Sequence, residues 1–229
     1  MTFDPVRCKT CEFDCSNHND LNSSELDLLM SAKREITYKK GETIFKQSSY
    51  VSHIVYVRSG LVKVFTEGYN DKNIILRFVK KGAYIGLPFL FNNNYSYFTA
   101  TAINNVELCL IEKNVFAKLM LNNKGLEKQI VNTISNDTGI LYQKITSLGT
   151  KQLHGRLATT ILSLSEKEFA EEKIFNYLTK RELAEFSGMS VESLMRLLNE
   201  LKSDRIIIQE GKNIIINDYD ILVKLSQVG

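Results

Sequence analysis

The sequence has few of the features that mark enzymes and membrane proteins. It contains three histidines in 229 residues, too few to support a histidine-based catalytic site or haem ligation. It has no Gly-rich phosphate loop, paired-carboxylate motif or nucleophile elbow, so no catalytic residue is predicted and we expect a protein that is not an enzyme. No run of about 18 apolar residues occurs, so no membrane partner is expected.

The N-terminus lacks the apolar segment of a secretory signal. Only four cysteines are present, and without an export signal we expect them to be reduced thiols or ligands rather than disulfides. Together these absences predict a cytoplasmic location.

A large excess of charge is also missing. The net charge is +3, and from Thr150 onward eleven Lys and Arg are set against twelve Asp and Glu. Any binding to nucleic acid must therefore use a local basic patch and depend strongly on salt. The candidates for that patch are Lys151, Arg156, Lys180, Arg181, Lys202 and Lys212.

The segment 179–201, TKRELAEFSGMSVESLMRLLNEL, predicts two short helices joined by a tight turn. Thr179 and Glu182 have the spacing of a capping box, which satisfies backbone amides at a helix start. Gly188 can adopt positive φ and end the first helix, and Ser190 can then cap the second. This is the layout of a helix-turn-helix.

The second helix separates an apolar face from an exposed one. Leu194, Leu197, Leu198 and Leu201 recur at helical spacing and should face the core. Glu192 and Arg196 are four residues apart and should share the exposed side. Arginine can bind guanine through two hydrogen bonds and a carboxylate can accept from cytosine, so double-stranded DNA is the expected partner. The alternative is an ordinary ion pair on the surface of a helical hairpin.

Before this segment, residues 35–112 contain short alternating runs separated by glycines, which predicts a small antiparallel barrel or roll. A helix of about six turns is expected over 125–148, where apolar residues recur at threes and fours. We expect its stripe to pair with a second copy of the chain, the alternative being that the helix packs on its own barrel. The stripe consists of Ile130, Ile134, Leu141, Ile145 and Leu148. After the helix-turn-helix, two β-rich runs around Glu210-Gly211-Lys212 predict a hairpin, the wing of a winged helix.

In this order the elements resemble the Crp/Fnr family of bacterial transcription regulators over essentially the whole chain. The matching motifs are YKKGETIF, VRSGLVKV, KKGAYIG, GRLA at 155–158 and the helix-turn-helix segment. The fold class is therefore expected to be α+β, with a cyclic-nucleotide-binding-like β-roll, a long dimerisation helix and a C-terminal winged helix-turn-helix. The expected domains are a cysteine-bearing arm at 1–22, the sensor roll at 23–120, the dimerisation helix at 121–149 and the DNA-binding domain at 150–229.

The resemblance implies a homodimer that binds a palindromic promoter site, contacts RNA polymerase and senses an effector at the roll. In the family, the residues matching Glu192 and Arg196 read the inner G·C pairs of each half-site, and Val191 is typical of the Fnr branch. Met195 stands where other members have Gly or Ser, so the outer bases are not predicted. The full set of expected DNA contacts is Thr179, Arg181, Ser190, Val191, Glu192, Met195 and Arg196.

Cyclic AMP is not expected to bind. Family members that bind it carry a Gly-Glu pair for the ribose and an Arg-Ser pair for the phosphate. Here Leu87 replaces the glutamate, and no arginine lies between Lys81 and Glu112. A buried phosphate without a cationic partner is poorly compensated.

Cys8, Cys11 and Cys15 form a C-x2-C-x3-C triplet, and Cys109 lies far away in VELCLIEK. Such a triplet suits a metal centre that a distant thiolate completes. The oxygen-sensing Fnr branch has a similar layout with an iron–sulfur cluster, although its last gap is usually five residues rather than three. Zinc, with His18 as another ligand, and no metal at all remain alternatives, and Cys109 also fits a plain core residue.

Two other functional classes stay open at this point. One is a metal- or redox-sensing interaction protein whose helix-turn-helix binds protein rather than DNA. The other is a metal-dependent redox enzyme that uses the cysteines.

Overall fold

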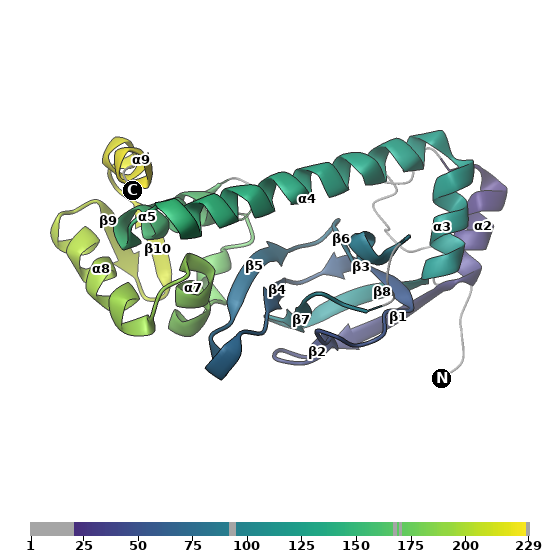
Figure 1. Ribbon diagram of the computed structural model, residues 1–229, viewed down its shortest axis with the longest axis horizontal. Helices are drawn as coiled ribbons and strands as arrows, with labels where there is room; N and C mark the ends of the chain where they lie inside the picture. The colour runs from purple at the N-terminus through teal and green to yellow at the C-terminus, as the bar shows by residue number, and fades with distance from the viewer. Residues whose placement is uncertain (1–20, 92–94, 167–168, 170, 228–229) are drawn as a thin grey trace. The chain divides into compact units, whose positions relative to one another are not determined.

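The computed structural model describes residues 21–91, 95–166, 169 and 171–227 (Figure 1). The chain divides into two compact units. The first contains the residues up to Val64 together with Phe78–Thr138, and the second contains Phe65–Arg77 and Gly139–Gly229. The arrangement confirms the expected α+β class, with a strand-rich N-terminal part, a long helix and a C-terminal winged helix-turn-helix.

The roll is built from two four-stranded sheets with the strand orders β1-β8-β3-β6 and β2-β7-β4-β5. In the first sheet β8 pairs antiparallel with β1 and β3, and β6 pairs antiparallel with β3. The strands are β1 Lys33–Tyr38, β2 Thr43–Phe45, β3 His53–Ser59, β4 Val62–Thr66, β5 Ile74–Val79, β6 Tyr84–Ile85, β7 Thr99–Ala102 and β8 Val106–Glu112. Short 3-10 turns lie at η2 Tyr69–Asp71 and η3 Leu87–Phe89.

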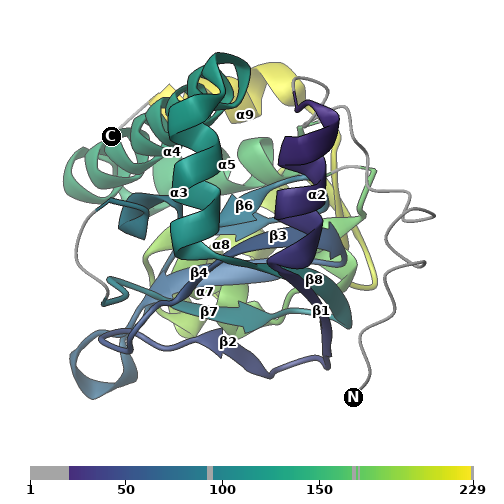
Figure 2. The same ribbon diagram turned by 90° about the vertical axis from the view of Figure 1, so that its right-hand side faces the viewer.

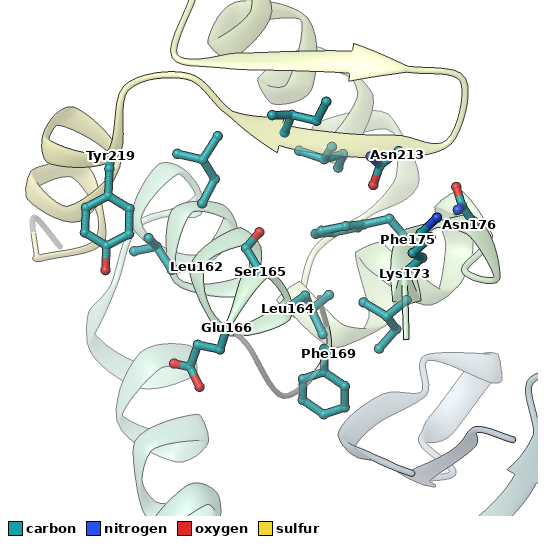
Figure 3. Close-up of a pocket in the computed structure, with 14 residues that line it drawn as sticks. Leu162, Leu164, Ser165, Glu166, Phe169, Lys173, Phe175, Asn176, Asn213 and Tyr219 are labelled. Carbon is teal, nitrogen blue, oxygen red and sulfur yellow. The ribbon is translucent and has the colours of Figure 1, made fainter. Parts of the chain in front are cut away.

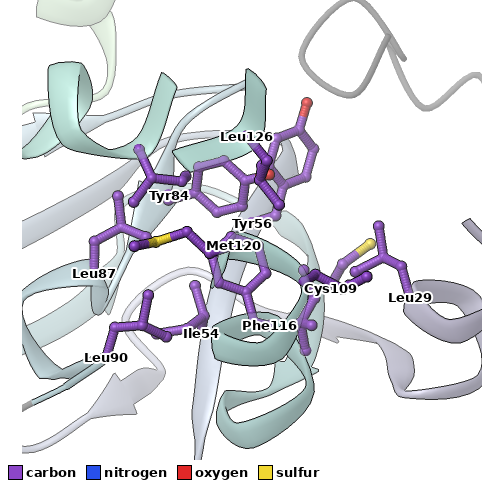
Figure 4. Packing of buried hydrophobic residues seen from close by; sticks show 13 residues of the cluster. Leu29, Ile54, Tyr56, Tyr84, Leu87, Leu90, Cys109, Phe116, Met120 and Leu126 are labelled. Atoms are coloured by element: carbon purple, nitrogen blue, oxygen red, sulfur yellow. The ribbon is translucent and has the colours of Figure 1, made fainter. Parts of the chain in front are cut away.

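Helices α2 (Ser23–Ser31) and α3 (Lys113–Asn122) lie side by side next to the first sheet (Figure 2). Helix α2 begins at a capping box formed by Asn22 and Glu25. The core between helices and sheet is rich in aromatic rings (Figure 4), with Tyr84 5.1 Å from Tyr56 and 5.4 Å from Phe116 between ring centroids. Leu126 and Ile130, from the start of the next helix, complete this cluster.

That next helix, α4, runs over Lys124–Thr150, two residues longer at its C-terminal end than predicted. The division between the two units falls inside it, between Thr138 and Gly139. Within the described residues, no helix is both long and apolar enough to cross a membrane.

The apolar stripe of α4 makes contacts within its own chain at both ends. Ile130 is fully buried in the core of the roll, with Ile134 packed against the same cluster. Leu148 packs against the backbone of Gly188 within the second unit. Ile130 is thus not left for a partner, whereas Leu148 is partly exposed and its place in a dimer face stays a prediction. Ile145 is 67% exposed in the single chain. A side chain that is covered only when a second copy binds would show such exposure.

The second unit contains α5 Leu153–Ser165, η4 Ile174–Asn176, α7 Lys180–Ser187, α8 Val191–Ser203, β9 Ile207–Glu210, β10 Asn213–Ile216 and α9 Tyr219–Gln227. Strands β9 and β10 pair antiparallel and form the expected hairpin, with Gly211 at φ +63° in its turn. The core joins the buried faces of α5, α7 and α8 through Leu157, Ile161, Leu183 and Leu197.

Candidate nucleic-acid interface

The start of α7 and the turn that follows it are fixed by local hydrogen bonds. The Thr179 hydroxyl accepts from the Glu182 amide at 3.1 Å, and the Glu182 carboxylate accepts from the Thr179 amide at 2.9 Å. Gly188 ends the helix in the left-handed conformation, and its amide donates to the Ala184 carbonyl. Ser190 caps α8 by accepting from the Ser193 amide. The capping box, glycine stop and second cap that the sequence predicts are therefore all confirmed.

Helix α8 buries one face and exposes the other. Its four leucines at 194, 197, 198 and 201 are each at most 4% exposed. All seven residues predicted to contact DNA are exposed, and they lie at the start of α7 and along α8 and its cap. They are Thr179, Arg181, Ser190, Val191, Glu192, Met195 and Arg196. The first turns of α8 thus offer polar and apolar side chains together on one accessible surface.

Arg196 is oriented by a neighbour that the sequence analysis did not single out. Its guanidinium donates to Glu200 at 2.8 Å, one turn further along α8, and not to Glu192. Glu200 also contacts Nε2 of His154 on α5 at 2.9 Å. The hydrogen bond from His154, followed by the one from Arg196, holds the pKa of Glu200 below its usual value. Glu192 is exposed at the start of α8, where a carboxylate is favoured by the helix dipole.

The residues of the predicted basic patch differ in the contacts they make. The pKa of Lys180 is lowered, first by its own partial burial and second by the positive charge of Lys202. Lys180 and Lys202 therefore lie close together and form a local positive site. Arg181 is exposed but bound to Glu185 at 2.9 Å. Arg156 is held within the fold, because its guanidinium donates to three backbone carbonyls. Its part in the patch stays a prediction, and one of the three contacts comes from a segment 32 residues away.

Cys109 lies in β8 and is fully buried. It belongs to the aromatic core of the roll, and Figure 4 shows its sulfur directed toward Leu29 of α2. Cys8, Cys11, Cys15 and His18 lie outside the described residues. In the part of the chain that is described, no group of three His, Cys, Asp or Glu side chains could hold a metal. In the described part of the chain Cys109 is therefore a buried core residue next to Tyr56 and Tyr84, and its role as a ligand stays a prediction.

The region that matches the cyclic-nucleotide site is filled by apolar and aromatic side chains. Leu87 and Phe89 are buried in η3, and the Phe89 ring lies 5.4 Å from Tyr97 and 5.2 Å from Phe98 between centroids. The nearby Ser96 hydroxyl donates to the Phe98 carbonyl and is buried. These contacts describe how the segment packs, and whether cyclic AMP binds there stays a prediction.

A separate cavity of about 740 Å³ lies in the second unit, among α5, η4, β10 and α9 (Figure 3). Leu162, Phe175 and Tyr219 give it apolar walls, and Asn213 adds a polar group. The Ser165 hydroxyl on its lining is buried and has no hydrogen-bond partner among the described residues. None of the predicted DNA contacts lines this cavity, so it is distinct from the exposed face of α8.

Comparison with known proteins matches both halves of the chain. The cyclic nucleotide-binding domain family matches residues 35–123, and the Crp-like helix-turn-helix domain family matches residues 155–225. Among curated relatives, the anaerobic regulatory protein of Pasteurella multocida (strain Pm70) is 28% identical over 96% of this chain and 83% of its own length. The fumarate and nitrate reduction regulatory protein of Escherichia coli (strain K12) is 26% identical over 96% of this chain and 90% of its own length.

Solved structures share the fold at lower identity. FixK2 from Bradyrhizobium japonicum superposes with a TM-score of 0.75 at 17% identity and covers 86% of this chain and 98% of its own. A CooA mutant from Carboxydothermus hydrogenoformans gives a TM-score of 0.76 at 17% identity, covering 94% and 95% of the two chains. These structures share the fold of this chain. The match to the Crp-like helix-turn-helix family and the regulatory relatives favour DNA over protein as the partner of α8.

Proposed function

Since the chain is a transcription regulator of the Crp/Fnr type, we propose that it binds a palindromic promoter site as a homodimer, with α8 of each copy in the major groove. The observation that carries this proposal is the surface of α8. Every predicted contact residue is exposed, while the leucines of the same helix are buried. A recognition helix needs this division, because it must be held by its core face and read bases with the other.

Within each half-site, Arg196 and Glu192 read base edges and the lysines near them position the duplex. Arg196 binds guanine through O6 and N7, and Glu192 accepts from the cytosine amino group. Glu200 lies one turn behind and orients the Arg196 guanidinium before DNA arrives. Lys180 and Lys202 supply contacts to phosphate that carry no sequence information.

The dimer forms along an exposed apolar face of α4. Val131 is 49% exposed, and Tyr142 and Ile145 are each 67% exposed. At 3.6 residues per turn these three side chains fall within roughly 60° of one another around the helix. This exposed face is rotated around α4 relative to the predicted stripe. Val131 and Tyr142 lie on it, whereas Ile130 and Leu148 do not. Ile134 and Leu141 lie at its edge. A helix with such a stripe buries it against its twin.

The signal is sensed at the roll or at the arm cysteines. The names of the relatives refer to anaerobic regulation and to fumarate and nitrate reduction, which supports a redox or oxygen signal. The cysteine triplet at 8, 11 and 15 offers thiolate ligands of the kind that iron–sulfur clusters and zinc use. Because Cys109 is enclosed by the core, we assign no step to it. The relatives are regulators, which also supports a regulatory rather than a catalytic role.

RNA polymerase is the proposed partner at the promoter, and the cytoplasm, where bacterial DNA lies, is the proposed location. Both proposals follow from the role of a transcription regulator, and cyclic AMP is not proposed as the effector. The binding proposal is tested by selecting duplexes from a random-sequence pool with the purified protein. The expected product is two inverted half-sites about one helical turn apart. Enrichment of no repeat, or of an isolated half-site, would contradict it.

The redox proposal is tested separately by purifying the protein without oxygen and recording its absorption spectrum and metal content. Iron with visible absorption that bleaches in air supports a cluster on the arm cysteines. Stoichiometric zinc in a colourless protein indicates the zinc alternative, and a metal-free protein removes both.

A further inference from the structure

The turn between α7 and α8 is fastened to the C-terminal half of α4 by two cationic side chains. Both of them, Lys144 and Arg156, lie in the second unit together with the turn. The sequence did not predict this role for either residue. In the turn, each of them contacts a backbone carbonyl that lies more than thirty residues away along the chain.

Lys144 lies on α4 and reaches the last residues of α7. Its ammonium donates to the backbone carbonyl of Phe186, and its Nζ lies 3.6 Å from the centroid of the Phe186 ring. A cation over an aromatic face and a charge-assisted hydrogen bond both hold this group in place. Burial of this group lowers the pKa of Lys144 to about 7.

Arg156, at the start of α5, joins three segments. Its Nη2 donates to the Leu148 carbonyl of α4 at 2.6 Å, and its Nε donates to the Lys151 carbonyl at 2.9 Å. Its Nη1 donates to the Gly188 carbonyl in the turn at 3.1 Å. One rigid guanidinium thus ties the end of α4, the connection to α5 and the helix-turn-helix together.

The turn and α4 are also in direct contact. A Cβ added to Gly188 would lie 2.1 Å from Cδ2 of Leu148, so the absence of a side chain lets α4 approach the turn. Polar contacts on two sides and this close packing leave the turn little freedom to pivot on α4.

We propose that Lys144 and Arg156 are positioning residues for DNA recognition, which fix the angle between the recognition helix and the C-terminal half of α4. The inference rests on the proposed dimer, since α4 is the element through which two copies join. If each α8 is held rigidly to its own α4, the distance and rotation between the two recognition helices follow from the α4 pair. The contacts that Lys144 and Arg156 make with the turn therefore determine which half-site spacing the dimer accepts.

The test uses the full-length protein and the duplex that the wild type selects from a random pool. Binding is measured to that duplex, to versions with one base pair added or removed at the centre, and to a single half-site. Each inserted base pair rotates one half-site by roughly 34°, so a rigid dimer should discriminate strongly. Lys144→Met retains the aliphatic stem over Phe186 and removes the donor and charge. Lys128→Met, an exposed change on the same helix, is the matched control.

We expect Lys144→Met to reduce the preference for the selected spacing by about tenfold, while half-site affinity changes less than about twofold. The control variant should keep the wild-type ratio. Phe186→Leu, which removes the ring but leaves the carbonyl, should give an intermediate loss and serves if the Met variant fails to fold. Equal losses on all duplexes, or an unchanged ratio in both variants, would overturn the proposal. A wild type without spacing preference would instead contradict the proposed dimer.

Discussion

Replacing Gly188 by alanine tests how tightly the turn is held against α4. Gly188 has φ +65°, and a residue with a side chain in the left-handed region costs roughly 1–2 kcal/mol. The new Cβ would also stand 2.1 Å from Cδ2 of Leu148. Because Leu148 can turn aside only by disturbing its own packing, we expect a further cost of roughly 1–3 kcal/mol. The sum is a loss of roughly 2–5 kcal/mol in the stability of the second unit.

Gly211 provides the matched control, since it has nearly the same φ of +63° in the wing turn and nothing within 4 Å of an added Cβ. Gly211→Ala should therefore cost only the backbone part, roughly 1–2 kcal/mol. Amide hydrogen exchange in α8 measures the opening free energy of this unit directly. Adding Leu148→Ala to Gly188→Ala should recover part of the steric cost. If Gly188→Ala costs no more than Gly211→Ala, the close contact with α4 does not hold the turn.

Three further predictions concern the dimer, the buried lysine and the roll. Ile145→Glu should weaken the dimer by roughly 3 kcal/mol, about two orders of magnitude in sedimentation equilibrium, whereas Ile140→Glu, on another face of α4, should not. Because burial lowers the pKa of Lys144 to about 7, the cost of removing its ammonium from water offsets part of what its contacts with Phe186 contribute, and this cost is largest at and below that pH. Between pH 6.5 and 8 the opening free energy should therefore rise by about 1 kcal/mol more in the wild type than in Lys144→Met, and equal slopes would refute this. Cys109→Ser should destabilise β8 by ~1–3 kcal/mol in hydrogen exchange, since a more polar hydroxyl has to be taken from water into a fully buried position, and an unchanged β8 would show that the site is not enclosed.

Features that depend on neighbouring residues in the chain could be predicted from the sequence. The capping box at Thr179, the left-handed stop at Gly188 and the wing turn at Gly211 each follow from the conformational preference of a few residues. The alternation of short strands and glycines likewise predicted the roll, and helical spacing predicted the buried leucines of α8.

Features that depend on tertiary contacts could not be predicted. The periodicity of α4 shows one apolar stripe, but it cannot tell that Ile130 belongs to the roll while Val131 is left exposed. The charge of Arg156 suggests phosphate, although backbone carbonyls from three segments occupy it. Glu200 meets His154 across 46 residues of sequence, a distance at which no local pattern is informative.

The most direct test of the central claim is a double-mutant cycle between Arg196 and the guanine it is proposed to read. Affinities of the wild type and Arg196→Ala are measured on the selected palindrome and on one in which the inner G·C pair of both half-sites is replaced. The account predicts that wild type discriminates by roughly 1–3 kcal/mol per half-site and that Arg196→Ala loses this discrimination. Equal discrimination by the two proteins would show that the exposed face of α8 does not read the site in this way.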